Sequence, residues 1–366
     1  MSVSRLGRVV AVASVFAGGH ANAQQALPRT PALEPVSRVR VVETDTLFLS
    51  RPTEIAIGPA GHAYVTEANE ARVLDLAPDG TIARTFGRKG QGPGEFMSPS
   101  TLAGLGDSML VVHDRVQRRL TFIGLKTWTY QRAVPTSLVW PPFMRAVGPI
   151  LFVGAWDLES LTSVARVGVE GELLAREGIY PEVGIKYPML IRGAFAWSAF
   201  AMTDAEVYAM YEVSPAIFRW SRGSKTGTEI PLPKKSRRGL DPSIFEQMLQ
   251  DPGNNARNLK LMYDRSIPVT IEFVADGVLA VVTMDYTVEQ NTQTVAFHVT
   301  VLDLARNRSC VDLPVPLARQ SMSMRDGIPR VAMRNNLLVV LEQGLDARGE
   351  SAPTLSTYRV DPTKCL

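Results

Sequence analysis

The fold is decided by residues 86–99, which are Phe86-Gly87-Arg88-Lys89-Gly90-Gln91-Gly92-Pro93-Gly94-Glu95-Phe96-Met97-Ser98-Pro99. This glycine-rich linker lies between two similar segments, because residues on its two sides match at an offset of 47. Matched positions include Pro52 with Pro99, Glu67 with Asp114, and Arg72 with Arg119. Self-similarity at a fixed period is typical of repeat architectures, so the chain is predicted to consist of repeated structural units.

Each unit contains four short strands. In the first unit, the apolar and β-branched segments are residues 54–58, 62–66, 72–77 and 81–86, and turn formers such as Pro78-Asp79-Gly80 separate them. Strands joined by tight turns form an antiparallel meander, and one meander alone cannot bury both of its faces. The units must therefore stack around an axis, which predicts an all-β protein with a β-propeller fold.

Two charged positions locate the later units: an acid at the end of the second strand and a basic residue in the third. They recur at Glu67 and Arg72, Asp114 and Arg119, Asp157 and Arg166, Glu212 and Arg219, Asp285 and His298, and Glu342 and Arg359. The recurrence predicts a six-bladed β-propeller of four-stranded antiparallel blades.

The segment from Pro52 to Ile123 resembles the NHL repeat family. The shared features are Pro52-x-x-Ile55-Ala56-Ile57, Tyr64-Val65-x-Glu67, Arg72-Val73-x-x-Leu76, Asp79-Gly80 and the linker of residues 86–99. Its glycines allow positive φ angles where the chain passes from the outer strand of one blade to the inner strand of the next. The resemblance implies a propeller. NHL-like propellers include RNA-binding animal proteins and a copper- and zinc-dependent lyase.

The ring is predicted to close through the N-terminal strand. The sixth unit ends after its third strand, whereas residues 36–49 form a strand-like stretch without a unit of their own. We expect this stretch to supply the missing outer strand, which leaves no unpaired blade edge at that point. The closure brings Cys310 and Cys365 to the seam between blades five and six. In an exported chain this pair favours a disulfide, and two free thiols are the alternative.

The N-terminus has the features of a secretory signal. Arg5 and Arg8 precede an apolar segment, and Ala21-Asn22-Ala23 provides a cleavage site. We expect residues 1–23 to be a signal peptide, residues 24–35 a linker and residues 36–366 the propeller, located in the periplasm or outside the cell. The apolar segment is much shorter than the roughly 20 residues that cross a bilayer, so no membrane span is expected.

Net charge indicates no nucleic-acid partner. Removal of the signal peptide lowers the formal net charge from +3 to 37 − 36 = +1, and the one dense basic run lies at residues 234–238. Proteins that bind nucleic acid usually carry a basic stripe or domain. We therefore interpret residues 234–238 as a solvated loop.

The long loops are predicted on a single face of the propeller, which we call the long-loop face. This face carries the loops between second and third strands and the connections between blades. The long loops are residues 87–98, 155–162, 178–192, 285–294 and 342–353, with an insertion at about 234–266 between blades four and five. In the insertion, Asp241-Pro242 before an apolar run predicts a helix. This helix is either a lid over the central channel or a decoration of the rim.

Candidate ligand-binding residues lie at this face. They are His113, Asp114, Arg115, Trp156, Asp157, Tyr211, Glu212, Asp285, Tyr286 and Glu342. Tyr and Trp provide large contact areas, which favours a protein, peptide or carbohydrate ligand, with loop packing as the alternative. The acids either form a cation site at the channel mouth or pair with bases and cap backbone amides. The acids recur in pairs with basic residues, which favours the second interpretation, so no metal site is assigned. If the first interpretation holds, the cofactor that these acids suggest is a divalent cation.

Catalytic signals are few. The mature chain contains His62, His113 and His298 without a metal-ligand spacing, and no Gly-x-Ser-x-Gly motif. We therefore expect an exported propeller that binds an unidentified ligand or protein through the long-loop face without catalysis. The alternative is a metal-dependent lyase or lactonase-type enzyme with its site at the channel mouth.

Overall fold

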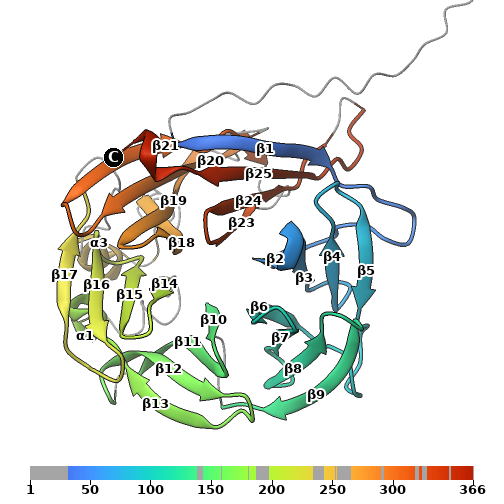
Figure 1. The fold of residues 1–366 in the computed structure, drawn as a ribbon, viewed down its shortest axis with the longest axis horizontal. Coiled ribbons are helices and arrows are strands. Elements are labelled where there is room, and N and C mark those ends of the chain that lie inside the picture. The colour runs from blue at the N-terminus through green and yellow to red at the C-terminus, as the bar shows by residue number, and fades with distance from the viewer. Residues whose placement is uncertain are drawn as a thin grey trace, which may run out of the picture.

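The protein is a ring of six β-sheet blades (Figure 1). The computed structural model describes residues 32–137, 143–157, 159–179, 181–186, 198–233, 243–251, 253, 265–289, 292–317, 321–323, 328–345 and 348–365. Each blade contains four strands connected in meander order, all neighbouring pairs being antiparallel. The prediction of an all-β, six-bladed propeller is confirmed.

In blades one to five, four strands run from the axis to the rim in chain order, whereas the outermost strand of blade six is the N-terminal strand (Figure 1). Blades one and two contain β2 (Pro52–Ile57), β3 (Ala63–Glu67), β4 (Arg72–Leu76) and β5 (Ile82–Phe86), then β6 (Pro99–Leu105), β7 (Met109–Asp114), β8 (Arg119–Gly124) and β9 (Thr129–Pro135). Blades three and four contain β10 (Met144–Val147), β11 (Ile150–Asp157), β12 (Thr162–Gly168) and β13 (Leu173–Glu177), then β14 (Ser198–Met202), β15 (Glu206–Tyr211), β16 (Ala216–Ser221) and β17 (Thr228–Pro231). Blade five contains β18 (Arg265–Ala275), β19 (Val278–Glu289), β20 (Thr292–Asp303) and β21 (Arg308–Pro314), and blade six contains β23 (Arg330–Arg334), β24 (Leu337–Glu342), β25 (Thr354–Val360) and β1 (Leu33–Arg40).

Helical elements are few and short. The 3-10 turns η1 (Pro59–Gly61) and η2 (Pro362–Lys364) lie in blade one and after β25. In the described residues, the α-helices are α1 (Glu182–Lys186), between blades three and four, and α3 (Ser243–Gln250), between blades four and five. Among the residues just described, no helix is long and apolar enough to span a membrane.

The hydrophobic core lies between the blades. Six apolar clusters each join two neighbouring blades, for example Phe152, Phe200 and Trp220 between blades three and four. Strand β3 is buried at every position because both of its faces meet a neighbouring blade, whereas β5 at the rim alternates between buried and exposed residues. Burial of apolar surface therefore holds the blades to one another and leaves the axis to the innermost strands.

The N-terminal strand closes the ring as predicted. In Figure 1, β1 lies along β25 at the rim, and the two pair antiparallel from Leu33 opposite Val360 to Arg40 opposite Thr354. The strand begins at residue 33 and ends at residue 40, so it lies earlier than the predicted stretch 36–49. The chain then contacts blade one, where Val42 N–H donates to Gly80 O at 2.9 Å. Gly80 has a φ of +89°, and a Cβ there would lie 2.4 Å from Arg40 O.

A disulfide joins the seam. Cys310 lies on β21 of blade five and Cys365 follows η2 after blade six, with a Cα–Cα distance of 5.6 Å. This separation falls in the usual range for disulfides. The predicted bond between the two blades is confirmed.

Two loop predictions differ from the structure. Residues 285–294 were expected to form a loop, but β19 continues to Glu289 and β20 begins at Thr292, so they form the end of a long hairpin. A fifth short strand, β22 (Ser321–Ser323), pairs with β20 there. The long loop 178–192 contains α1, which the sequence did not predict.

The helix of the insertion is confirmed as α3. Ile244 packs against the cluster between blades three and four, and Glu246 accepts a hydrogen bond from Lys186 of α1 at 2.8 Å. Of the insertion, residues 234–242, 252 and 254–264 lie outside the described part. In the part that is described, α3 contributes no residue to the lining of the central cavity.

Candidate functional site

In blade one, the acid at the end of the second strand holds a loop. Glu67 is fully buried, and its Oε2 accepts a hydrogen bond from Arg72 Nε at 2.9 Å. Its Oε1 accepts from the backbone N–H of Ser50 at 2.6 Å. Burial raises the pKa of Glu67, and the hydrogen bond from Arg72 opposes this shift. The pair-and-cap interpretation is confirmed for this blade.

In blade two, the predicted site residues are mostly buried. Asp114 is fully buried, and its carboxylate accepts hydrogen bonds at 2.6–3.2 Å from the backbone N–H groups of Met97, Ser98, Val116 and Gln117. His113 is fully buried as well, with Nδ1 3.1 Å from Ser100 Oγ. Arg115 is exposed on the turn after β7, and its backbone N–H donates to Ser98 O at 3.0 Å. The acid therefore caps the glycine-rich linker.

In blade three, Asp157 is half-buried near the end of β11. Its Oδ2 accepts a hydrogen bond from Ser160 Oγ, and Arg176 Nε lies 3.4 Å away. The Ser160 hydrogen bond, followed by the charge of Arg176, lowers the pKa of Asp157. Arg166 was the expected partner of Asp157, but its Nε lies 3.1 Å from Glu177 Oε2 instead. The side chain of Trp156 lies outside the described part.

In blade four, Tyr211 and Glu212 are fully buried. The Tyr211 hydroxyl lies 2.5 Å from Ser163 Oγ of blade three, and burial raises its pKa. The expected base, Arg219, donates to Glu206 at 2.8 Å rather than to Glu212. Tyr211 thus packs between two blades and does not face a loop.

In blades five and six, the acids lie near basic residues. Asp285 Oδ2 lies 3.7 Å from His298 Nδ1, which is the predicted partner, whereas Glu342 Oε2 lies 4.0 Å from Arg38 of β1 rather than near Arg359. Tyr286 is buried in the cluster between these blades. Among the described residues, no group of three or more His, Cys, Asp or Glu side chains has an arrangement that could hold a metal ion.

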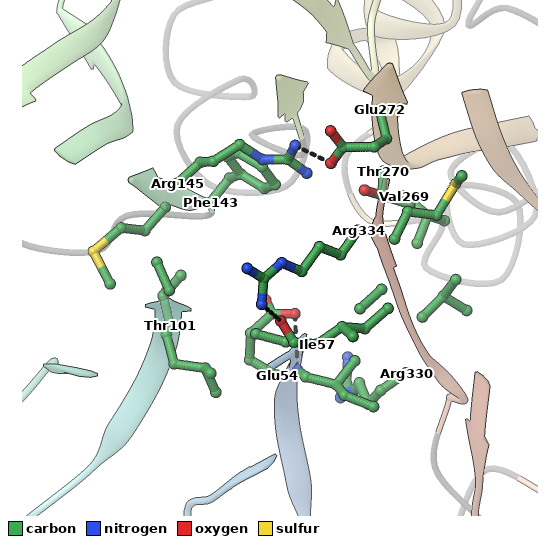
Figure 2. Close-up of a pocket in the computed structure, with 18 of the residues that line it drawn as sticks. Glu54, Ile57, Thr101, Phe143, Arg145, Val269, Thr270, Glu272, Arg330 and Arg334 are labelled. Atoms are coloured by element: carbon green, nitrogen blue, oxygen red, sulfur yellow. Dashed lines mark hydrogen bonds and ion pairs between the residues drawn. The ribbon is translucent and has the colours of Figure 1, made fainter. Parts of the chain in front are cut away.

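A different set of polar residues meets on the propeller axis. A cavity of about 340 Å³ is lined by residues of all six innermost strands (Figure 2). Most of the described lining residues are apolar or small, such as Ile57, Leu102 and Met284. Its charged side chains are Glu54, Arg145, Glu272, Arg330 and Arg334. A cavity that combines apolar side chains with a few convergent polar groups is typical of small-molecule sites.

Two of the three arginines in the cavity are neutralised. Arg145 donates to Glu272 across the channel, and both side chains are about four-fifths buried, with exposures of 20% and 18%. Arg334 donates to Asp107 of the turn between β6 and β7, and to Ile57 O at 3.4 Å. These ion pairs connect blade three with blade five and blade six with blade two.

The remaining arginine, Arg330, has no such partner among the described residues. Its Nε donates to Pro52 O at 3.1 Å, and no carboxylate of the described chain lies within ion-pair distance of its guanidinium. The nearest charge that acts on it favourably is Glu54 on the adjacent strand β2. Figure 2 shows Glu54 and Arg330 on one side of the cavity and the Arg145–Glu272 pair on the other.

Glu54 is an unusual carboxyl group. Its Oε1 accepts a hydrogen bond from the backbone N–H of Ile55 at 3.1 Å. Burial raises the pKa of Glu54 from 4.5 to about 7, and the Ile55 hydrogen bond and the charge of Arg330 offset only part of that shift. Near neutral pH the side chain therefore exists in both protonation states.

Comparison with solved structures supports the fold. The chain is similar to a protein of Bacteroides fragilis NCTC 9343 that carries the description of an exported protein, with a TM-score of 0.55 and 11% identity over 90% of this chain and 96% of that one. It is also similar to the WD40 repeats of RRP9, with a TM-score of 0.53 and 8% identity over 89% and 99% of the two chains. Virginiamycin B lyase from Staphylococcus aureus gives a TM-score of 0.48 at 12% identity, over 89% and 99%.

Likenesses at such low identity show the propeller fold alone. No protein-family model and no curated protein sequence matches the chain. The similarity of residues 52–123 to NHL repeats therefore stays a resemblance, and the arguments about function depend on the residues of this chain.

The sequence analysis missed the charged residues of the cavity. All of them lie on innermost strands, where the neighbouring positions are apolar, as in Pro52-Thr53-Glu54-Ile55-Ala56-Ile57. A charged residue inside a strand that packs against other blades has only the axis as open space. That signal was present in the sequence and identifies Glu54, Arg145 and Glu272.

Proposed function

We propose that this protein is an exported binding propeller that holds a small ligand in its central cavity and has no catalytic activity. The observation that supports the proposal is the cavity of about 340 Å³, in which charged side chains from four blades meet. Its size and mixed lining suit a small molecule with both an apolar and a polar part. The ion pairs between non-adjacent blades keep the cavity walls in place and favour a pre-formed site.

The ligand enters from the long-loop face in this proposal. The innermost strands start at that face, and the lining includes Phe143, Ser198 and Pro329, which lie at or just before such starts. Arg115, Asp157 and Asp285, which are members of the predicted site and are exposed or half-buried, would contact a ligand or a protein partner at the rim.

Export is supported by three observations. The N-terminal residues have the pattern of a signal peptide, the Cys310–Cys365 disulfide suits an oxidising compartment, and a structurally similar protein carries the description of an exported protein. Cell fractionation with N-terminal sequencing tests this part. We expect the protein outside the cytoplasm with Gln24 as its first residue, and a cytoplasmic chain that retains residues 1–23 would contradict it.

Binding is tested with the protein purified from its native compartment. Native mass spectrometry should detect a co-purified small molecule in the wild type and lose it in Gly104→Phe. Gly104 lines the cavity. An added Cβ would lie 3.6 Å from the nearest atom, Gly106 O, so the first atom of a larger side chain fits there without a clash. Gly253→Phe, on an exposed turn, is the matched control. A ligand kept equally by both variants would place binding elsewhere.

The same preparation tests the enzymatic alternative. Metal analysis should find no stoichiometric metal in a non-catalytic binding protein. A bound metal that is lost in Asp285→Ala would favour the lyase or lactonase-type function instead.

A further inference from the structure

We propose that the central cavity binds an organic carboxylate through Arg330, and that the ligand enters together with a proton taken up by Glu54. This inference rests on the proposed function, because it names the chemical class of the ligand that the cavity holds.

Arg330 is the cation that remains for a ligand. Arg145 is neutralised by Glu272 and Arg334 by Asp107, whereas among the described residues the Arg330 side chain donates from Nε to Pro52 O and to no other acceptor. Its two Nη groups thus keep their hydrogen-bond donors for another acceptor. A guanidinium matches the planar geometry of a carboxylate and binds it with two parallel hydrogen bonds.

Glu54 decides when this cation is available. While Glu54 is ionised, its negative charge stabilises the positive charge of Arg330. The same negative charge repels a second carboxylate from this part of the cavity. When Glu54 is protonated, the repulsion disappears and its O–H becomes a donor to a ligand oxygen. A ligand carboxylate and the Glu54 proton therefore favour each other.

The other groups around Glu54 leave this coupling intact. Of the strands packed against β2, β6 is uncharged, and on β3 Glu67 is engaged by Arg72. Strand β23 supplies Arg330 and, at its other end, Arg334, and the charge of Arg51, just before β2, also acts on Arg330. Across the cavity lies the closed pair of Arg145 and Glu272.

The lining selects an organic acid with an apolar part. Beside the charged groups, the cavity wall contains Ile55, Ile57, Leu102, Met144, Met284 and Phe297. A single unneutralised cation suits one negative charge, whereas a phosphate dianion would need more. The apolar wall gains free energy by burying a hydrocarbon or aromatic group. A monocarboxylate on a ring or a short chain therefore fits better than an inorganic anion.

The coupling predicts the direction of the pH dependence. If only the protein with protonated Glu54 binds the ligand, the apparent affinity equals the intrinsic affinity multiplied by the protonated fraction of Glu54. With a pKa of about 7, this fraction is roughly nine-tenths at about pH 6 and about 3% at about pH 8.5. The affinity is thus expected to fall by up to about 30-fold over that range.

The experiment uses the mature protein with benzoate, benzamide and inorganic phosphate as probes, followed by ligand-observed NMR titration and calorimetry at acidic and alkaline pH. Benzamide has the shape of benzoate without its charge. Benzoate should bind at pH 6, benzamide and phosphate at least tenfold more weakly, and Gly104→Phe should abolish binding. Benzoate affinity should fall at alkaline pH in the wild type.

Two substitutions assign the residues. Arg330→Gln should lose benzoate binding, while Arg88→Gln, at an exposed linker position, should keep it. Glu54→Gln should bind benzoate with the same affinity at both pH values, because Gln cannot titrate. Circular dichroism confirms that each variant is folded.

Each failure has a separate meaning. Benzamide binding as tightly as benzoate, with both excluded by Gly104→Phe, would overturn the carboxylate proposal and leave the binding function standing. Absence of benzoate binding at pH 6, an unchanged affinity in Arg330→Gln, or the same pH dependence in Glu54→Gln would overturn it too. The binding function itself is tested separately, by native mass spectrometry of the co-purified ligand in the wild type and in Gly104→Phe.

Discussion

Replacement of Glu54 by Gln should stabilise the folded protein at alkaline pH. The folded-state pKa of Glu54, about 7, lies above its unfolded value of 4.5, so the folded state binds the proton more tightly. Below pH 4.5 the group is protonated in both states and costs nothing. As the pH rises from 4.5 to about 7, the unfolded state ionises first, and the wild type loses stability over this window. Gln keeps the shape of the protonated acid and can accept the Ile55 hydrogen bond.

The size of the effect follows from the two pKa values. The difference between about 7 and 4.5, at about 1.4 kcal/mol per pH unit, gives a ceiling of about 3 kcal/mol. Water in the cavity reaches part of the Glu54 side chain, which is half-buried, so the expected gain is about 2 kcal/mol. Residues that serve binding commonly cost stability in this way.

Urea denaturation of the wild type and of Glu54→Gln at several pH values measures the difference. We expect equal free energies of unfolding near pH 4.5 and a gain that grows to its plateau above pH 7. Glu170→Gln, at an exposed turn where the carboxylate pairs with Arg132, should show no such trend. A gain that does not vary with pH, or a less stable Gln variant above pH 7, would refute the assignment of a raised pKa to Glu54.

Three other changes to the chain test the architecture. Changing both Cys310 and Cys365 to Ser should lower the free energy of unfolding by about 4 kcal/mol, because the bond closes a loop of 55 residues; a urea midpoint equal to that of the reduced wild type checks that only the bond was lost. Deletion of residues 33–40 should expose the edge of β25 and cause aggregation in size-exclusion chromatography, and a monomeric, folded product would contradict ring closure by β1. Asp114→Ala should cost about 3 kcal/mol by leaving four backbone amides without their acceptor, and an unchanged melting temperature would show that the cap contributes little.

The repeat could be recognised because the acids of the first two blades have the same structural role. Glu67 and Asp114 accept hydrogen bonds from backbone amides at the start of their blades, so a carboxylate recurs at the same point of both units. Hydrogen bonding to these amides requires a carboxylate at this position, whereas the position of its basic partner can vary. This is why Arg119 and Arg166 have partners other than the ones expected, as Arg119 donates to Glu95 O and Arg166 pairs with Glu177.

The errors in the loops come from local sequence that suits two structures. Residues 285–294 contain polar side chains at alternate positions, which suit a loop but equally a hairpin with one face in solvent. Pairing with β22 makes the hairpin the better structure. Similarly, α1 has only five residues and no Ser, Thr, Asn or Asp cap that would have marked its start from sequence.

The predicted binding residues were chosen by side-chain type, and several of them are buried in the structure. His113, Tyr211 and Glu212 have the chemistry of a site, but their side chains lie inside the protein. Sequence cannot distinguish an acid that faces solvent at a loop from one that turns back to cap amides, because both occur at the end of a strand. Distances to backbone N–H groups are needed, and the structure supplies them for Asp114.

In the cavity the same reasoning leads from burial to function. A charge on an innermost strand is expensive unless it is paired, and Arg145 and Arg334 follow this rule through Glu272 and Asp107. Arg330 departs from it, because Glu54 is partly protonated near neutral pH and compensates it incompletely. A cation without full compensation in a cavity binds anions, and the acid that shares the space must take up a proton when one arrives. In our proposal, ligand binding and protonation of Glu54 are therefore thermodynamically coupled: Arg330→Gln should remove the binding, whereas Glu54→Gln should keep the binding and remove its dependence on pH.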